Sequence, residues 1–87
     1  MFYDPRSEHH GLPHNPWLGL IVPRPIGWIS TVSSDGIPNL APYSCFQTIS
    51  SNPPFLMFSS DRPKDSATNA EDTGHFCANL ATYALRN

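Results

Sequence analysis

The fold is decided by residues 23–31, which read PRPIGWIST. From Ile26 to Val32 the chain is rich in β-branched and aromatic side chains, a composition that predicts a strand. The next residues, SSDG at 33–36, end in an Asp-Gly pair, in which Gly36 supplies the positive φ of a tight turn. Asn39 to Phe46 then returns as the partner strand, so this part of the chain predicts a β-hairpin.

The composition describes a small chain that is poor in charge. Its 87 residues allow one domain at most, and 14% of them are charged, against about 25% in an average soluble domain. We therefore expect part of the surface to be covered by another subunit or by the remainder of a larger domain. The net charge of −2 provides no basic surface and argues against nucleic acid and anionic membranes as partners.

The sequence carries no sign of membrane insertion or export. No apolar run approaches the roughly 20 residues that a helix needs to cross a bilayer. The first residues, MFYDP, have neither the basic region nor the apolar region of a secretory signal. Cys45 and Cys77 are too few for a disulfide framework, and we expect both to be reduced thiols. These features predict a cytoplasmic protein.

The remaining segments predict a mainly β chain. We expect an irregular lead-in at residues 1–16 and a strand or extended segment at 17–22, where an apolar run stops at a proline. The paired prolines at 53–54 break the chain, because they cannot sit in a central ladder. Beyond them we expect a strand at 55–58, a helix at 65–72 capped by Asp65 and ended by Thr73-Gly74, a strand at 76–80, and the start of a second helix at 81–87. Four strands and one helix before the last strand do not close a barrel.

Four motifs mark this order: PRPIGWIST at 23–31, NLAPYS at 39–44, SSNPP at 50–54 and KDSATN at 64–69. Read together, they closely resemble the N-terminal half of the flavin reductase-like family of FMN-binding split barrels. The resemblance implies a Greek-key β-barrel with one short α-helix, of which residues 17–87 hold the N-terminal part. We therefore expect an incomplete barrel, and a chain that is a truncated form or fragment.

The resemblance implies a site for FMN, and the chemistry would belong to that cofactor. Segments that match 39–46 and 50–54 line the isoalloxazine ring and the ribityl chain in the family. The residues that would contact the flavin there, by backbone amide or hydroxyl, are Ser44, Cys45, Phe46 and Ser50. Taken singly, Ser44 and Ser50 are more typical of hydroxyls that satisfy nearby backbone groups.

The phosphate of FMN is expected at residues 64–69. A helix that begins here directs free backbone N–H groups and the positive end of its dipole at an anion. Ser66 can donate its hydroxyl, and Lys64 or Arg62 can neutralise the charge. The family usually has Thr where this chain has Ser66, and Asn69 belongs to the same motif. The alternative is an ordinary solvated helix start.

Other conspicuous side chains have simpler interpretations. Arg24 lies between two prolines, which aim it reproducibly; it is either near the flavin, as the resemblance implies, or part of a surface ion pair. Trp28 is typical of a core residue, and Trp17 of a core residue or a subunit contact. Zinc needs three or four ligands in a preset geometry, so we expect a solvated tail and no metal site at His9, His10 and His14.

The function that the resemblance implies is an oxidoreductase in which NAD(P)H reduces FMN, and the flavin passes electrons to an acceptor or supplies a partner oxygenase. The sequence has no G-x-G-x-x-G fingerprint, so nicotinamide binding rests on the resemblance alone. The alternatives are a non-catalytic FMN-binding or dimerisation module and an inert fragment. Because open strands leave unpaired backbone groups, we expect at least a homodimer with FMN close to its interface.

Overall fold

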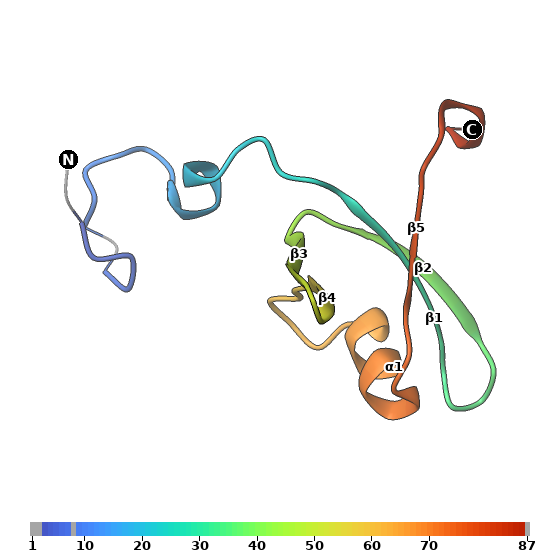
Figure 1. The fold of residues 1–87 in the computed structure, drawn as a ribbon. Helices are drawn as coiled ribbons and strands as arrows, with labels where there is room; N and C mark the ends of the chain where they lie inside the picture. Colours follow the sequence, from blue (N-terminus) through green and yellow to red (C-terminus); the bar gives the residue numbers. More distant parts are fainter. Residues whose placement is uncertain (1–2, 8, 87) are drawn as a thin grey trace.

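Two small antiparallel sheets and a helix make up the fold (Figure 1). The computed structural model describes residues 3–7 and 9–86. Within these residues the elements are, in chain order, η1 (Trp17–Leu20), β1 (Gly27–Val32), β2 (Pro38–Tyr43), β3 (Phe46–Ser51), β4 (Pro54–Phe58), α1 (Asp65–Thr73), β5 (Cys77–Asn79) and η2 (Tyr83–Leu85), where η denotes a 3-10 helix. The first sheet has the order β2-β1-β5, and the second consists of β3 and β4.

The β1–β2 hairpin confirms the prediction from residues 26–46. The two strands pair antiparallel along their whole length. Gly36 has a φ of 84° and donates its N–H to the carbonyl of Ser33 at 2.9 Å, which closes the expected turn. Alternate residues of β1 are buried, namely Gly27, Ile29 and Thr31. One face of this central strand therefore forms the middle of the core.

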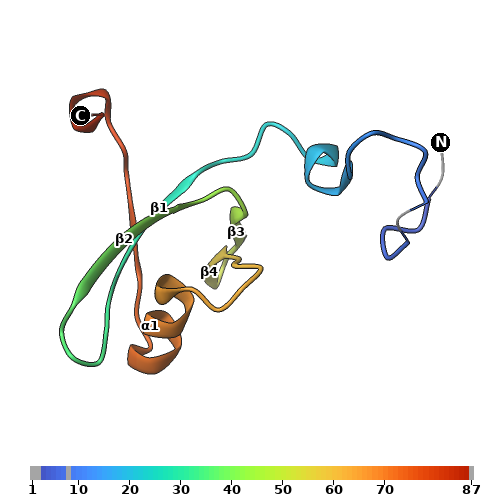
Figure 2. The same cartoon turned by 180° about the vertical axis from the view of Figure 1, so that it is seen from behind.

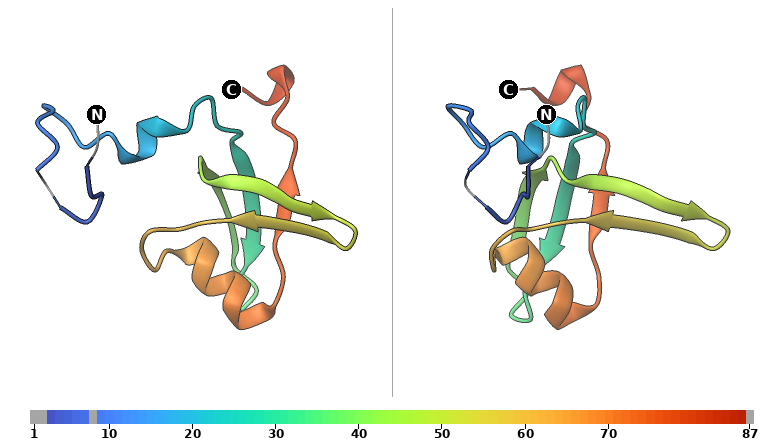
Figure 3. Two further views of the ribbon diagram at one scale, coloured as in Figure 1. Left: turned by 60° about the vertical axis from the view of Figure 1, so that its left-hand side comes forward. Right: turned by 90° about the vertical axis from the view of Figure 1, so that its left-hand side faces the viewer.

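The β3–β4 hairpin is absent from the pattern that the sequence predicts. That pattern continues the second strand to Phe46 and has no strand at 47–51, whereas the chain turns after Tyr43 and a new strand starts at Phe46. The carbonyl of Cys45 accepts the N–H of Ser59 at 2.8 Å, so the corner is tied to the end of β4. Figure 3 shows this hairpin crossing the three-stranded sheet, with its tip projecting away.

Helix α1 lies where the sequence placed it, but its cap differs. Lys64 is the N-cap residue and makes no side-chain hydrogen bond to the helix, so the prediction of Asp65 as the cap was wrong. Asp65 is the first helical residue, where a carboxylate interacts favourably with the helix dipole. Gly74 ends the helix at a φ of 75° and donates its N–H to the carbonyl of Ala70, as the predicted exit requires.

Two hydrogen bonds between side chains fasten α1 to the β1–β2 hairpin. The Nδ2 of Asn69 donates to the Oγ1 of Thr31 at 3.1 Å, and the Nδ2 of Asn39 donates to the Oγ of Ser66 at 2.8 Å. Thr31, Ser66 and Asn69 are all buried. The helix accordingly lies against β1 and β2, as both Figure 1 and the opposite view in Figure 2 show. Polar pairs, and not an apolar stripe, fix its position.

The apolar core is small and mostly aromatic. Ile29 and Tyr43 are the buried hydrophobic residues in the described part of the chain. The ring of Phe58 lies 4.9 Å from the Tyr43 ring and 4.8 Å from the Phe76 ring, measured between centroids. These contacts join the base of the β3–β4 hairpin to the first sheet, so the two sheets meet through aromatic packing.

Two terminal segments differ from the prediction. Residues 17–20 form a 3-10 helix and not a strand, because Pro16 has α-like dihedral angles and its carbonyl accepts the N–H of Gly19 at 2.9 Å. At the other end, the expected helix at 81–87 is reduced to the single turn of η2, and residue 87 lies outside the described residues.

The folded chain leaves much of its surface in water. It exposes 7307 Å², whereas a typical folded monomer of 9.6 kDa exposes about 5,100 Å². The described residues form a mainly β structure in which the two sheets do not close into a barrel, in agreement with the expected fold class. None of the helices in residues 3–7 and 9–86 is long and apolar enough to cross a membrane.

Candidate functional site

A cavity of about 630 Å³ opens where the β2–β3 corner, the loop between β4 and α1, and the segment around η1 meet. Three residues that the sequence assigned to a flavin lie in its wall: Ser44, Cys45 and Lys64. The remaining lining residues are Asn15, Trp17, Leu18, Pro42, Tyr43, Ser59, Ser60 and Asp61. The cavity thus combines hydroxyl groups and charged groups with apolar and aromatic side chains.

The corner between β2 and β3 is the rigid part of this cavity. Tyr43 is buried beneath it and packs against Phe58. The hydrogen bond from Ser59 to the carbonyl of Cys45 joins the end of β4 to the corner. Ser44 and Ser59 are therefore held on neighbouring strand ends, where hydroxyl and backbone groups have fixed positions for recognising a polar ligand.

The loop before α1 supplies the charge. The Nζ of Lys64 lies 3.7 Å from the Oδ1 of Asp61, and both side chains are largely exposed. An exposed pair of this kind contributes little to stability, so Lys64 remains available to an anion. Ser60 donates its hydroxyl to the carbonyl of Arg62 at 2.6 Å and shapes the loop. Helix α1 begins directly after Lys64, which adds the positive end of its dipole.

Two of the predicted phosphate residues lie on the inner face of α1. Ser66 is 1% exposed and its Oγ accepts a hydrogen bond from Asn39, while Asn69 bonds to Thr31. Neither residue lines the cavity. Their observed contacts fasten the helix to the sheet, and a contact between either side chain and phosphate stays a prediction.

The other predicted residues also lie outside the cavity wall. Phe46 follows the corner and packs its ring against Gly27. Ser50 is near the far end of β3, where its hydroxyl donates to the carbonyl of Pro53. Arg24 donates from Nη1 to the carbonyl of Leu18 at 2.7 Å and makes no ion pair among the described residues. Roles for these three residues at a flavin remain predictions.

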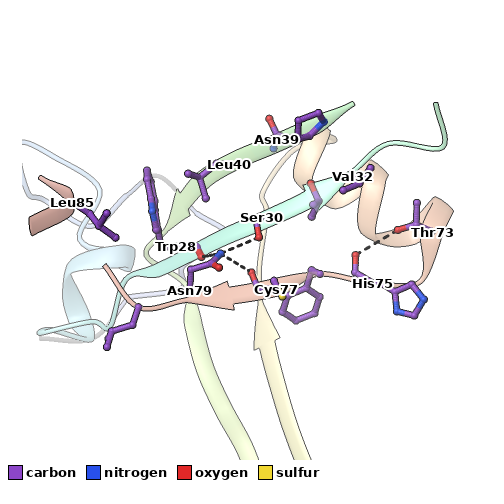
Figure 4. Close-up of a pocket in the computed structure, with 14 residues that line it drawn as sticks. Trp28, Ser30, Val32, Asn39, Leu40, Thr73, His75, Cys77, Asn79 and Leu85 are labelled. Atoms are coloured by element: carbon purple, nitrogen blue, oxygen red, sulfur yellow. Dashed lines mark hydrogen bonds between the residues drawn. The ribbon is translucent and has the colours of Figure 1, made fainter. Parts of the chain in front are cut away.

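A larger hollow of about 1090 Å³ lies on one face of the three-stranded sheet (Figure 4). Its walls are mainly apolar, with Trp28, Leu40 and Leu85 among them; Asn39 and Leu40 of the segment 39–46 line it, but none of the individual residues assigned to flavin does. The amide group of Asn79, which also lines it, donates to the Trp28 carbonyl and to the Ser30 hydroxyl, so the sheet itself uses that group. We therefore place the candidate site at the smaller cavity.

The cysteines and possible metal ligands do not add a second site. Cys45 and Cys77 are free thiols, as predicted from the sequence. In the part of the chain that the structure describes, no three His, Cys, Asp or Glu residues gather where they could hold a metal ion. The Nδ1 of His10 accepts the N–H of Leu12 at 3.0 Å, which gives it a local role in the lead-in.

Sequence reasoning missed part of the cavity wall. Ser59 and Ser60 follow the apolar run at 55–58, which the sequence pattern favours as a buried strand but which is largely exposed in the described structure, and they precede a loop with two basic residues; that position was a usable signal for a polar site. Asn15, Trp17 and Leu18 gave no such signal, because they lie in or beside a lead-in without hydrophobic period. Only the fold brings them to residues 44–45 and 64.

Residues 18–85 match a known protein family, the flavin reductase like domain. An uncharacterized protein of Aquifex aeolicus is 50% identical over 70 residues, which cover 75% of this chain and 36% of that protein. The uncharacterized protein YwrF of Bacillus subtilis is 39% identical over 71 residues, covering 77% of this chain and 35% of YwrF. The chain therefore spans about a third of the length of these curated relatives.

A solved structure has a similar fold. It is the crystal structure of nitrilotriacetate monooxygenase component B from Bacillus cereus, with a TM-score of 0.73 and 31% sequence identity. The match covers 87% of this chain and 41% of that protein. The two sheets and the helix described above thus correspond to part of a longer chain in the similar structure.

Proposed function

Because this chain belongs to the flavin reductase-like domain family, we propose that it forms the FMN-binding part of an oxidoreductase that transfers electrons from NAD(P)H through flavin to an acceptor. The observation that supports this most directly is the cavity at the β2–β3 corner. It unites Ser44, Cys45 and Lys64, which the sequence had assigned to FMN from two separate motifs.

The residues around the cavity fit the chemical parts of FMN. The ring edge needs hydrogen-bond partners, for which Ser44, Ser59 and the backbone of the corner are suited. The ring faces need apolar cover, which Pro42 and Leu18 offer. The phosphate needs a cation and N–H donors, and Lys64 precedes the start of α1. When bound, FMN itself would supply the hydride and electron transfer.

The residues outside the wall enter the proposal indirectly. Ser66 and Asn69 orient the helix whose first turn faces the phosphate, since their side chains bond to the sheet. Phe46 supports the corner from below through its packing on Gly27. Ser50 lies near the other end of β3 and outside the wall of this cavity, and its contact with FMN stays a prediction.

Lys64 gives the sharpest test, because its structural and proposed functional roles predict opposite effects. Lys64→Ser should weaken FMN binding about five- to tenfold, since one half-exposed charge-assisted contact is lost. Riboflavin, which lacks the phosphate, should bind as before. The same change should raise the free energy of unfolding by about 0.5–1 kcal/mol, because serine is a better N-cap than lysine. Calorimetric titration and denaturant unfolding measure the two quantities.

Arg62→Ser is the matched control for Lys64→Ser. Arg62 carries the same charge two residues earlier but lies in a different hollow, beside Pro63 and Thr68. The Arg62→Ser variant should bind FMN with an affinity within about twofold of the unmodified chain. Removing one positive charge near the cavity accounts for a change of that size. Lys64 would be removed from the phosphate site if Lys64→Ser lost as much affinity for riboflavin as for FMN. A larger loss of FMN affinity in Arg62→Ser than in Lys64→Ser would have the same meaning.

A non-catalytic FMN-binding or dimerisation module is the second candidate. It needs the same cavity but no nicotinamide site, and the sequence carries no G-x-G-x-x-G fingerprint for one. The two candidates differ in one assay: the oxidoreductase consumes NADH or NADPH in the presence of FMN, and the module binds FMN without doing so. A chain that retains no flavin absorbance after purification with FMN, and binds none on titration, would contradict both.

Association and cellular context complete the proposal. The folded chain exposes about 2,000 Å² more than a typical monomer of its mass, which is more than the roughly 800 Å² that one partner contributes to a standard interface, and another subunit or the remainder of a larger domain would cover such an area. We propose a homodimer, tested by sedimentation with and without FMN, and a monomer that binds FMN tightly would overturn it. We further propose a cytoplasmic location, and an oxygenase as a recipient of electrons, given the monooxygenase component with a similar fold.

A further inference from the structure

The 3-10 helix η1 lies at the cavity beside the β2–β3 corner, although it is distant in the sequence from the other residues that line this cavity. Its residues Trp17 and Leu18 line the same cavity as Ser44, Cys45 and Lys64. Trp17 as a whole residue is nevertheless 56% exposed, and no residue of η1 is buried. Apolar packing within the chain therefore does not explain why this short helix lies at the cavity.

A single polar contact holds η1 to the segment that leads into β1. The Nη1 of Arg24 donates to the carbonyl of Leu18 at 2.7 Å. Arg24 lies between Pro23 and Pro25, which restrict the backbone on both sides of it and so limit where its guanidinium can lie. The contact spans six residues and closes a loop that presents Trp17 to the cavity.

Local hydrogen bonds fix the backbone of η1, so the position of Trp17 is defined although its side chain is not buried. The N–H of Trp17 donates to the Oδ1 of Asn15 at 3.1 Å, and the N–H of Gly19 donates to the carbonyl of Pro16 at 2.9 Å. A large aromatic ring that is half exposed beside a cavity offers a flat apolar surface. A flat aromatic ligand is the kind of molecule that such a surface covers well.

We propose that Trp17 covers one face of the isoalloxazine ring, and that Arg24 is a positioning residue that holds Trp17 there through the carbonyl of Leu18. This inference rests on the proposed function, because it names the wall of the same flavin cavity. It gives Arg24 a role at the flavin without direct contact, and it gives Trp17 a role that is neither core packing nor a subunit contact.

The first test compares two residues of η1 with nearly equal exposure. Trp17→Ala should weaken the binding of FMN and of riboflavin equally, by about five- to tenfold, because the indole stacks on the isoalloxazine ring, which both ligands have, and not on the phosphate. Leu20→Ala, at 58% exposure and outside the cavity wall, should leave both affinities unchanged. Trp17→Phe keeps an aromatic ring and should recover most of the lost affinity.

The second test separates positioning from direct binding by Arg24. Arg24→Ala should produce the same equal loss for both ligands, and adding it to Trp17→Ala should cause almost no further loss, because both changes remove the same contact. The emission of bound FMN gives an independent readout, since an indole in contact with the ring quenches it. That emission should rise in Trp17→Ala and in Arg24→Ala, and not in Leu20→Ala.

Each outcome has a distinct meaning. Unchanged flavin affinity and unchanged emission in Trp17→Ala would overturn the inference. In that case, a loss of affinity for FMN but not for riboflavin in Lys64→Ser would still support the proposal that the cavity binds flavin. Fully additive losses for Trp17 and Arg24 would overturn the positioning role of Arg24. If the unmodified chain bound neither FMN nor riboflavin, the inference and the proposed function would both fail.

Discussion

Gly27→Ala should lower the free energy of unfolding by about 1–3 kcal/mol, the usual cost of overpacking a well-filled site. A Cβ at this position would lie 2.6 Å from the Cδ2 and 2.7 Å from the Cγ of Phe46, well inside contact distance. Both residues are constrained, since Gly27 begins the central strand β1 and Phe46 begins β3. Urea unfolding followed by circular dichroism measures the loss.

Two further variants show whether the ring of Phe46 causes that loss. Gly19→Ala is the matched control, because a Cβ there meets nothing within 4 Å, and it should be nearly neutral. Phe46→Ala removes the obstructing ring, so combining it with Gly27→Ala should cost less than the sum of the two single changes. If the Gly27→Ala variant were as stable as the Gly19→Ala variant, β1 and β3 would be able to move apart at this point without cost.

Asn69→Ala should cost about 1–3 kcal/mol, because it leaves the buried hydroxyl of Thr31 without its partner. Thr31→Val should cost a similar amount by leaving the Asn69 amide unpaired. The double variant Thr31→Val with Asn69→Leu replaces both polar groups and should recover a large part of the loss. Thr68→Ala, on the exposed side of the same helix, is the control.

Additive losses in the Thr31 and Asn69 variants would mean that the 3.1 Å contact contributes nothing as a pair. The FMN affinity of Asn69→Ala should fall together with stability, since the helix start would no longer be fixed beside Lys64. Affinity that is retained after a clear loss of stability would show that the helix start needs no anchoring by the sheet to bind phosphate.

The sequence predicted the β1–β2 hairpin and the bounds of α1, because local chemistry decides both. Gly36 and Gly74 adopt positive φ where a turn and a helix exit were expected. Strand β3 was missed for a physical reason: its residues at 47–49 are exposed in succession, so the strand carries no alternation of apolar and polar side chains. Its pairing with β4 comes from the corner at Cys45.

The candidate site could be predicted only in part. The family resemblance pointed to Ser44, Cys45 and Lys64, and the fold brings them together. The inward direction of Ser66 and Asn69 depends on partners 27 and 38 residues away, respectively, which no local pattern specifies. The contribution of the segment at 15–18 depends on a side chain reaching back to a backbone carbonyl, and the sequence gives no signal for that contact.

The large area that the folded chain leaves in water also determines how it responds to denaturant. The steepness with which urea lowers stability is proportional to the surface newly exposed on unfolding. A chain that exposes 7307 Å² while folded has about a quarter less surface to expose on unfolding than a compact monomer of its mass, so its unfolding transition should be broader than that of such a monomer. Any partner that covers the face of the three-stranded sheet with the larger hollow should steepen the unfolding transition. The slope of stability against urea concentration therefore measures how much of this face is covered.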